Sequence, residues 1–372
     1  MFTILNQDQN TKARRATLKT SHGEIQTPFF MPVGTSATVK SLSSEDLKEI
    51  NSQIVLSNTY HLFLRPGMDI IKNAGGLHGF MNWNKPILTD SGGYQVFSLS
   101  QFRKITDDGV KFQSHLDGST HFLRPEDIVS IQGILGSDIM MPLDECAPYP
   151  CGERQAKEAL DRTTLWARRS REFFLSSPLK EKHFLFGIVQ GSNYKDLREQ
   201  SAKEIVDIGF DGYAIGGVSV GEPIEFMFHA ISQVEPFLPE DKPRYVMGIG
   251  TPDQIVKAVG KGIDMFDTCI PTRYGRNGSA FTSRGRLVVR NAEFASDLRP
   301  LDDQCDCFVC RNHSRSYIRH LYNANEITGL HLISYHNVYF YIKLMERIRK
   351  AIEQNIYDQF QKEFLACYGS TL

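Results

Sequence analysis

The chain has 372 residues, a formal net charge of −1, an apolar fraction of 41% and a charged fraction of 23%. These values are typical of a soluble globular protein and leave room for two average domains or for one barrel with additions. Seven cysteines, no export signal and no apolar run of bilayer-spanning length predict a cytoplasmic protein with reduced thiols and no membrane association.

The first segment of the chain has the alternation of a β-hairpin. The stretch ARRATLKTSHGEIQTPFF alternates polar and apolar residues on both sides of Ser21, His22 and Gly23. A small or polar turn between two alternating runs is typical of two antiparallel strands. We therefore expect residues 1–28 to form an N-terminal β-hairpin that caps the main fold.

Eight short apolar runs follow, and helical patterns separate most of them. Continuous apolar runs suit strands that are buried on both faces, as in a parallel sheet. Helix starts lie between them, as at Ser43 or Ser44, at Pro125, and at Thr251 followed by Pro252. The runs are FFMPVGT (29–35), IVLSNTY (54–60), PILTDSGG (86–93), DIMMPLDE (138–145), FLFGIVQG (184–191), GYAIGG (212–217), RYVMGIG (244–250) and DMFDTCIPT (264–272).

Eight alternations of strand and helix predict a closed eight-stranded parallel β/α barrel, with a doubly wound open sheet as the alternative. Residues 273–336 lack this rhythm and contain many arginines and histidines. We expect them to form a basic, metal-binding insert, followed by a long amphipathic helix over residues 337–365. The sequence thus predicts a single domain over residues 1–372.

Polar groups recur where the predicted strands end. In a β/α barrel the carboxyl ends of the strands form the active site. Three of these ends carry carboxylates, at Asp90, Asp144 and Asp267, and two others carry the amides of Asn58 and Gln190. Two acids on either side of a sugar can exchange the substituent at its anomeric carbon, one as nucleophile and one as proton carrier.

The third acid suits recognition of a purine. A carboxylate accepts two hydrogen bonds, which matches the N1–H and exocyclic amine of guanine. Asp144 with Gln190 and the backbone at Gly217 can read that edge, and Tyr94 and Met247 can cover the faces of the base. Each residue alone is more simply explained as packing or as a turn.

Three clustered cysteines indicate a metal site. Cys305, Cys307 and Cys310 place three thiolates within six residues. With one histidine they match a closed, structural zinc site. The spacing leaves the fourth ligand open, since His313 is close in sequence and His336 lies where the last helix is expected to begin.

A segment without acidic residues runs from Thr268 to Asn291. It contains five arginines, among them Arg273 and Arg276, and directly follows Asp267. Arginines at the rim of the pocket can hold the phosphates of an RNA whose base has been extruded from its stack. A solvated basic loop is the simpler alternative.

Several motifs together resemble the bacterial tRNA-guanine transglycosylase family. They are DSGGYQVFSLS, PLDECAPYP, GIVQGS, YAIGGVSVGE, YVMGIGTPDQ, MFDTCIPTRYGRNGSAF, CDCFVC and SYHN, and they extend from about Arg15 to the last helix. The resemblance implies a zinc-bearing barrel that works as a homodimer. It also implies exchange of guanine at the first anticodon position of tRNA for a 7-deazaguanine base in queuosine biosynthesis.

The resemblance also assigns roles to particular residues. Asp267 would be the nucleophile and Asp90 the general acid/base. Recognition of the base would fall to Asp144, Gln190, Gly217 and the carbonyl of Val218, stacking to Tyr94 and Met247, contact with the anticodon loop to Arg273 and Arg276, and zinc binding to Cys305, Cys307, Cys310 and His336.

The segment Val218-Ser219-Val220-Gly221-Glu222 bears on which base is inserted. Queuine-inserting relatives have glycine where Val220 stands, so Val220 and Cys146 favour the smaller 7-aminomethyl-7-deazaguanine. Glu222 is then expected near the substrate amine. The alternatives are a queuine-inserting or archaeosine-type enzyme and a non-catalytic tRNA-binding paralogue. A glycoside hydrolase would leave the cysteine cluster and the basic segment unexplained.

Overall fold

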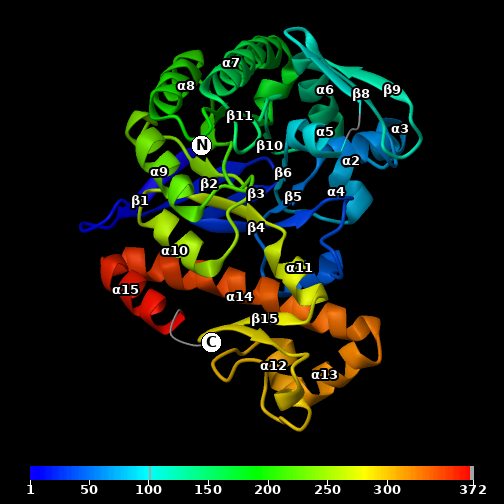
Figure 1. Ribbon diagram of the computed structural model, residues 1–372, viewed down its shortest axis with the longest axis vertical. Helices are drawn as coiled ribbons and strands as arrows, with labels where there is room; N and C mark the ends of the chain where they lie inside the picture. Colours follow the sequence, from blue (N-terminus) through cyan, green and yellow to red (C-terminus); the bar gives the residue numbers. More distant parts are fainter. Residues whose placement is uncertain (100–101, 369–372) are drawn as a thin grey trace.

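A computed structural model describes residues 1–99 and 102–368, and eight parallel strands in it close into a barrel (Figure 1). The closing pair joins the last strand to the first, with Met265 opposite Phe29 and Thr268 opposite Pro32. The predicted β/α barrel is confirmed, and each of the eight apolar runs supplies one strand. The strands are β4 (Phe29–Gly34), β5 (Val55–Ser57), β6 (Ile87–Thr89), β10 (Ile139–Met140), β11 (Phe184–Val189), β12 (Gly212–Ile215), β13 (Arg244–Val246) and β14 (Met265–Thr268).

Both faces of the barrel strands are buried, as their continuous apolar sequences require. In β4, Phe29 and Met31 join an inner cluster with Leu88 and Ile188, whereas Phe30 belongs to the larger core between strands and helices. Alternate residues of one strand therefore fill the barrel interior and the layer outside it.

Helices lie around the barrel in the order of the chain. Several start at the signals seen in the sequence, with capping boxes at Ser43 and Thr251 and a proline in the first turn at Pro125. The helices are α1 (Ser44–Glu49), α2 (Thr59–Leu64), α3 (Met68–Asn73), α4 (Gly76–Met81), α5 (Gly93–Leu99), α6 (Pro125–Leu135), α7 (Glu153–Ser176), α8 (Lys195–Ile208), α9 (Ile224–Val234) and α10 (Pro252–Val259), with short 3-10 turns η1 (Pro178–Glu181) and η2 (Glu235–Phe237).

The N-terminal segment is a three-stranded antiparallel sheet. The predicted hairpin is formed by β2 (Arg14–Thr20) and β3 (Gly23–Thr27), but β1 (Phe2–Gln7) adds a further strand beside β2. Leu18 and Ile25 reach the inner cluster of the barrel, so this sheet closes the end opposite the strand carboxyl termini.

A second antiparallel sheet was not anticipated from the sequence. It consists of β7 (Arg103–Thr106), β8 (Gly109–Gln113) and β9 (Thr120–Leu123) and lies between α5 and α6 in the chain. Val110 and Phe112 pack into the main core, which fixes the sheet against the barrel.

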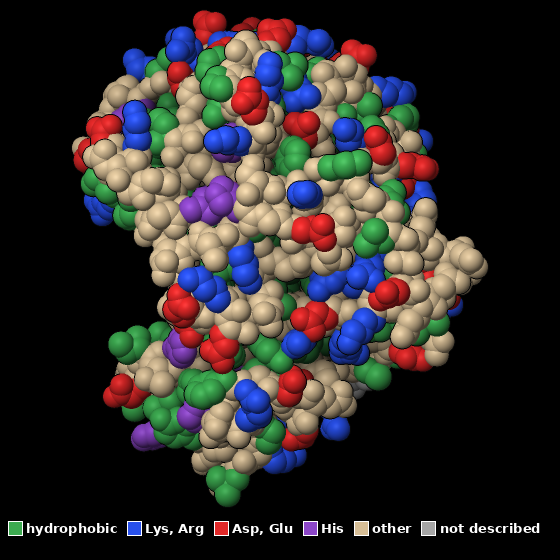
Figure 2. Space-filling model, turned by 180° about the vertical axis from the view of Figure 1, so that it is seen from behind, with side chains coloured by type: hydrophobic (Ala, Val, Ile, Leu, Met, Phe, Trp, Pro, Cys, Tyr) green, Lys and Arg blue, Asp and Glu red, His purple; other side chains and the backbone are tan. Residues whose placement is uncertain are grey.

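The segment after β14 forms a smaller lobe beneath the barrel in Figure 1. It contains α11 (Ile270–Arg276), the hairpin of β15 (Ser279–Thr282) and β16 (Gly285–Val288), η3 (Ala292–Phe294), α12 (Phe308–Asn312) and α13 (Arg315–Asn323). The space-filling view shows the waist between the two lobes, with Lys and Arg side chains interspersed with Asp and Glu (Figure 2).

The expected helix over residues 337–365 differs in the structure. Helix α14 (Ile327–Glu353) begins earlier, inside the segment predicted as insert, and α15 (Tyr357–Tyr368) follows after a break. Asn355 has a left-handed φ of 57° there, and its side chain accepts a hydrogen bond from the Gln9 N–H at 2.7 Å. The apolar spacing continues across this break, so the sequence pattern did not reveal it. Within the described residues no helix has the length and hydropathy needed to cross a membrane.

Candidate active site and metal centre

Asp90 lies where β6 ends and is 8% exposed. One carboxylate oxygen, Oδ1, accepts the backbone N–H of Thr59 at 3.0 Å. The other, Oδ2, accepts the side-chain amides of Asn58 and Gln95, the latter at 2.9 Å. Burial raises the pKa of Asp90 to about 6, against the lowering effect of these hydrogen bonds. Asp90 is thus held in place and able to exchange a proton near neutral pH.

Asp267 lies in β14 and is partly exposed. Its Oδ1 accepts two hydrogen bonds, from the Tyr245 hydroxyl at 2.6 Å and from the Gly248 N–H at 2.7 Å. Because both fall on one oxygen, Oδ2 carries neither of them and can face a substrate. Burial raises the pKa of Asp267 as well.

The two carboxyl groups interact electrostatically. The charge of Asp267 contributes to the raised pKa of Asp90, after the larger effect of burial. Tyr245, buried and bonded to Asp267, has its pKa raised by burial first, and the charges of Asp267 and Asp90 both add to this. The structure therefore brings Asp90 and Asp267 to one place, although they are far apart in the sequence.

Asp144 follows β10 and is buried. Its Oδ1 accepts the Ser91 hydroxyl at 2.8 Å, and its Oδ2 accepts the Gln190 side-chain amide at 2.8 Å. Gly93 touches it so closely that a Cβ there would lie 2.5 Å from the Asp144 carbonyl oxygen. Asp90 and Asp144 are therefore linked through the short segment 90–93.

Gly217 lies against this group and has a φ of 59°. A Cβ at Gly217 would lie 2.5 Å from the side-chain oxygen of Gln190, so only glycine fits both the space and the backbone conformation. The structure thus brings Asp144, Gln190 and Gly217 together, as a single recognition site requires.

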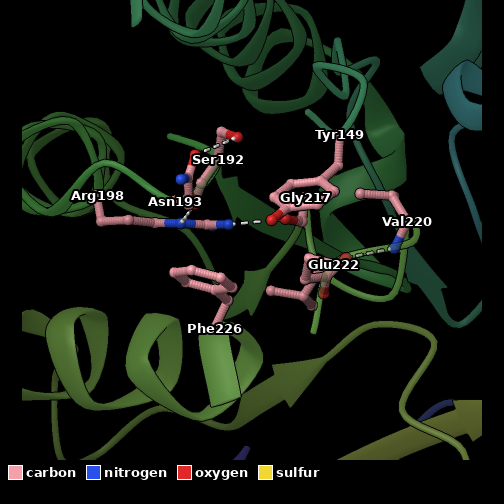
Figure 3. A pocket seen from close by; sticks show the side chains of 9 residues that line it. Tyr149, Ser192, Asn193, Arg198, Gly217, Val220, Glu222 and Phe226 are labelled. Carbon is pink, nitrogen blue, oxygen red and sulfur yellow. Dashed lines mark hydrogen bonds between the residues drawn. The ribbon is translucent and has the colours of Figure 1, made fainter. Parts of the chain in front are cut away.

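A buried arginine that the sequence did not single out orders this loop (Figure 3). Arg198, on α8, is 1% exposed. Its guanidinium donates to the carbonyls of Gly216 at 2.6 Å, Gly217 at 2.8 Å and Ser192 at 2.7 Å. Burial lowers the pKa of Arg198 to about 10, a value at which the group stays charged at neutral pH.

A cavity of about 240 Å³ lies beside Gly217, lined by Arg198, Val218, Val220, Glu222 and neighbouring side chains. The Glu222 carboxylate accepts the backbone N–H groups of Ser219 and Val220, the latter at 2.8 Å. Because N–H and C=O of one peptide unit point in opposite directions, the Val218 carbonyl points away from Glu222.

The two residues expected to stack on a base differ in burial. Tyr94 begins α5 directly after the Asp90 segment, and half of it (51%) is exposed. Met247 follows β13 and packs partly against the inner barrel cluster. Both follow strand ends that also carry site residues, Asp90 for Tyr94 and Gly248 for Met247.

The two arginines of the basic segment lie on α11, directly after β14 and Asp267. Arg273 is exposed, and Arg276 is half-buried, with its Nε donating to the Thr272 carbonyl at 3.2 Å. Their helix thus starts at the strand end that bears the candidate nucleophile.

The cysteine cluster converges on His336. Its Nδ1 lies 3.7, 3.5 and 3.3 Å from the Sγ atoms of Cys305, Cys307 and Cys310. Ligand atoms around a tetrahedral ion of zinc size lie about 3.5 Å apart for a sulfur–nitrogen pair, so the four groups fit a metal ion. The other ring nitrogen, Nε2, donates to the Phe281 carbonyl at 2.7 Å, which orients Nδ1 toward the thiols. His313, the alternative, is not part of this group.

Several residues of the site were missed by sequence reasoning. Tyr245 lies inside an apolar run and reads as core, and Arg198 lies in a helical pattern where arginine is normally solvated. Asn58 was noted at a strand end without a role, and Ser91 and Gln95 lie in the motif around Asp90. Only the position next to a predicted strand end gave a signal for the last three.

The fold and the site define a β/α-barrel enzyme with a paired-carboxylate active site and a separate metal-binding unit. A family model described as queuine tRNA-ribosyltransferase matches residues 8–370. A relative of that name from Pelotomaculum thermopropionicum is 56% identical over 367 residues, covering 99% of this chain and 98% of its own. Relatives of the same name from Thermoanaerobacter pseudethanolicus (55% identical; 99% and 97% covered) and Ruminiclostridium cellulolyticum (53%; 100% and 98%) are similar over the same extent. The chain belongs to the queuine tRNA-ribosyltransferase family, which confirms the resemblance inferred from its motifs.

Proposed function

We propose that this protein is a tRNA-guanine transglycosylase of queuosine biosynthesis, which exchanges guanine at the first anticodon position of tRNA for a 7-deazaguanine base. Family membership over nearly the whole chain supports the reaction class. The observation that carries the mechanism is the pairing of Asp90 with Asp267 at one end of the barrel.

In this mechanism Oδ2 of Asp267 attacks the anomeric carbon of the ribose, and the bond from that carbon to N9 of guanine breaks. Its electron pair goes to N9, and the proton of Asp90 neutralises the departing base. Asp90, now a carboxylate, takes the N9 proton of the incoming base, which attacks the same carbon and releases Asp267. The raised pKa of Asp90, about 6, suits a group that gives and takes a proton.

Recognition of the base follows from the hydrogen bonds of the empty pocket. Asp144 presents two acceptor oxygens for the N1–H and exocyclic amine of guanine, in place of its present contacts to Ser91 and Gln190. Gln190 and the backbone at Gly217 then serve the carbonyl edge, and Tyr94 and Met247 cover the two faces.

The preferred incoming base is 7-aminomethyl-7-deazaguanine. Glu222 accepts the Ser219 N–H, which turns the Val218 carbonyl the other way, as an acceptor for a substrate ammonium group. Val220 and Cys146 fill the space that the larger queuine would need. Replacing Val220 by glycine should relax the preference toward queuine, and an unchanged preference would remove this assignment.

The RNA is held by the rim of the pocket and by the smaller lobe. Arg273 and Arg276 contact the phosphates of the anticodon stem-loop. The Cys305, Cys307, Cys310 and His336 group holds one structural Zn²⁺ per subunit, since a closed set of three thiolates and one imidazole leaves no position for water. The ion would fix the lobe and take no part in the chemistry.

The working unit is a homodimer in the cytoplasm. The smaller lobe exposes Phe308 (41%), Tyr317 (43%) and Ile327 (76%), apolar side chains that a second subunit can cover.

The reaction is tested with the Asp267→Ala variant. We expect no incorporation of labelled guanine into tRNA, while guanine binding, metal content and Tm stay near those of the wild type. Retained incorporation would remove Asp267 as the nucleophile. Loss of guanine binding as well would show a damaged pocket, and the Asp267→Asn variant, which keeps an oxygen for Tyr245, then separates the two effects.

A further inference from the structure

A second group of metal-ligating side chains lies at the opposite end of the barrel from the active site. It consists of His22, His78 and Asp138, whose ligand atoms all lie within 4.8 Å of one another. Asp138 directly precedes β10, whereas Asp144 follows that strand. The group is therefore separate from the catalytic carboxylates and from the cysteine cluster.

Three different elements supply the group. His22 lies in the turn between β2 and β3, His78 in α4, and Asp138 at the start of β10. The imidazole rings stack with their centroids 3.6 Å apart and an angle of 18° between their planes. Stacked in this way, both rings turn a nitrogen toward the same carboxylate.

The distances between donor atoms suit a shared ion. His22 Nδ1 lies 2.9 Å from one oxygen of Asp138, and His78 Nε2 lies 3.4 Å from the other. His78 Nε2 also lies 3.1 Å from the Lys85 carbonyl oxygen, a further neutral ligand. Around an ion with ligand bonds of 2.0 to 2.2 Å, neighbouring donor atoms lie about 3.0 to 3.4 Å apart. The 3.4 Å separation is long for a hydrogen bond to nitrogen.

The carboxylate is prepared for a cation. Asp138 is 1% exposed, and its oxygens also accept the backbone N–H groups of His22 at 3.2 Å and Ile87 at 2.9 Å. Burial alone would raise the pKa of Asp138, but the hydrogen bonds from His78, His22 and Ile87 lower it below the ordinary value. The His22 side chain is 39% exposed and that of His78 is 13% exposed, so an ion and its remaining water ligands can enter from solvent.

We propose that His22, His78 and Asp138 bind a divalent transition-metal ion such as Zn²⁺ or Co²⁺. Two imidazole nitrogens and one carboxylate are the ligand set that such ions take in proteins. The ion ties the turn of the N-terminal sheet to α4 and β10. Because this end of a β/α barrel serves stability, the ion would strengthen the closure of the barrel floor and leave base exchange unchanged. A hydrogen-bonded imidazolium–carboxylate group without an ion is the competing explanation.

The test uses the full-length protein with its cysteine cluster already loaded with zinc. Co²⁺ is added at buffered free concentration, excess is removed by dialysis, and both metals are counted by elemental analysis. We expect one further ion per chain, bound without loss of zinc and without the intense thiolate-to-cobalt absorption that a cysteine site gives. The Tm should rise with the Co²⁺ concentration, because the ion binds the folded state.

Two variants and one control decide the assignment. His22→Ala, in an exposed turn, and His78→Gln, which keeps a donor for the Lys85 carbonyl, should each lose the additional cobalt and the rise in Tm. His229→Ala removes an exposed histidine of α9 and should keep both. Absence of an additional ion in the wild type, or equal binding by wild type and His22→Ala, would overturn the proposal. Should His78→Gln fail to fold, the His22→Ala result stands alone.

Discussion

Replacing Asp144 by asparagine should separate recognition of the base from stability of the fold. Asp144 offers two acceptor oxygens, now occupied by Ser91 and Gln190 at 2.8 Å each. Asparagine keeps one acceptor and places an amine where a guanine N–H should bind. The loss is one hydrogen bond to a charged group, about 1.5 to 3 kcal/mol, with about 1 to 3 kcal/mol more for the unpaired donor. Affinity for guanine should therefore fall by roughly 10²- to 10⁴-fold.

The same substitution should leave the protein at least as stable as the wild type at neutral pH. Burial raises the pKa of Asp144, so the folded protein favours the neutral carboxyl group. The stability that Asp144 contributes is then present at low pH and is lost as pH rises through the folded-state pKa. Asparagine is neutral at every pH and avoids this loss.

Guanine affinity is measured by calorimetry and stability by thermal unfolding at pH 7. Asp161→Asn, which alters an exposed carboxylate on α7, is the matched control and should change neither quantity. Guanine affinity within about threefold of the wild type would refute the assignment of Asp144 to the base edge. A reduced affinity together with a large fall in Tm would instead point to a structural role.

Three further predictions concern other groups of the site. Arg198→Met leaves the Gly216 and Gly217 carbonyls without their donor, which costs about 1 to 3 kcal/mol for each unpaired group, so KM for guanine should rise at least tenfold while RNA affinity, from filter binding, stays constant. Asp267→Asn removes a negative charge near Asp90, so the pKa of Asp90, about 6 in the wild type, should fall when followed by carbon-13 NMR of its carboxyl group; an unchanged pKa would mean that the two groups do not interact. Chelation of the metal, or Cys310→Ser, should lower the Tm and weaken binding of the anticodon stem-loop, whereas an unchanged Tm would show that the cluster does not support the smaller lobe.

The barrel could be predicted from the sequence because its strands are buried on both faces. Each of them is therefore a short continuous apolar run, and the residue that follows it lies at the active-site end. Asp90, Asp144 and Gln190 were found in this way, before any contact was known. The cysteine spacing was equally informative, because three thiols within six residues have few other uses.

Other features left no such trace. The sheet of β7, β8 and β9 has short, partly exposed strands that resemble ordinary connecting segments. Arg198 was missed because a buried arginine and a solvated one look alike in a helical pattern, and only the packed backbone carbonyls of the 216–217 loop distinguish them. The break before α15 depends on a left-handed Asn355, a conformation that asparagine permits but does not announce.

The most direct test of the catalytic pair is to capture the covalent intermediate. The protein is incubated with an anticodon stem-loop RNA and guanine, quenched under denaturing conditions and digested, and the RNA-linked peptide is identified by mass spectrometry. The account predicts an adduct on the peptide containing Asp267, absent from the Asp267→Ala variant and still able to form when Tyr94 is replaced. An adduct on Asp90 or Asp144, or the same adduct in the Asp267→Ala protein, would contradict it.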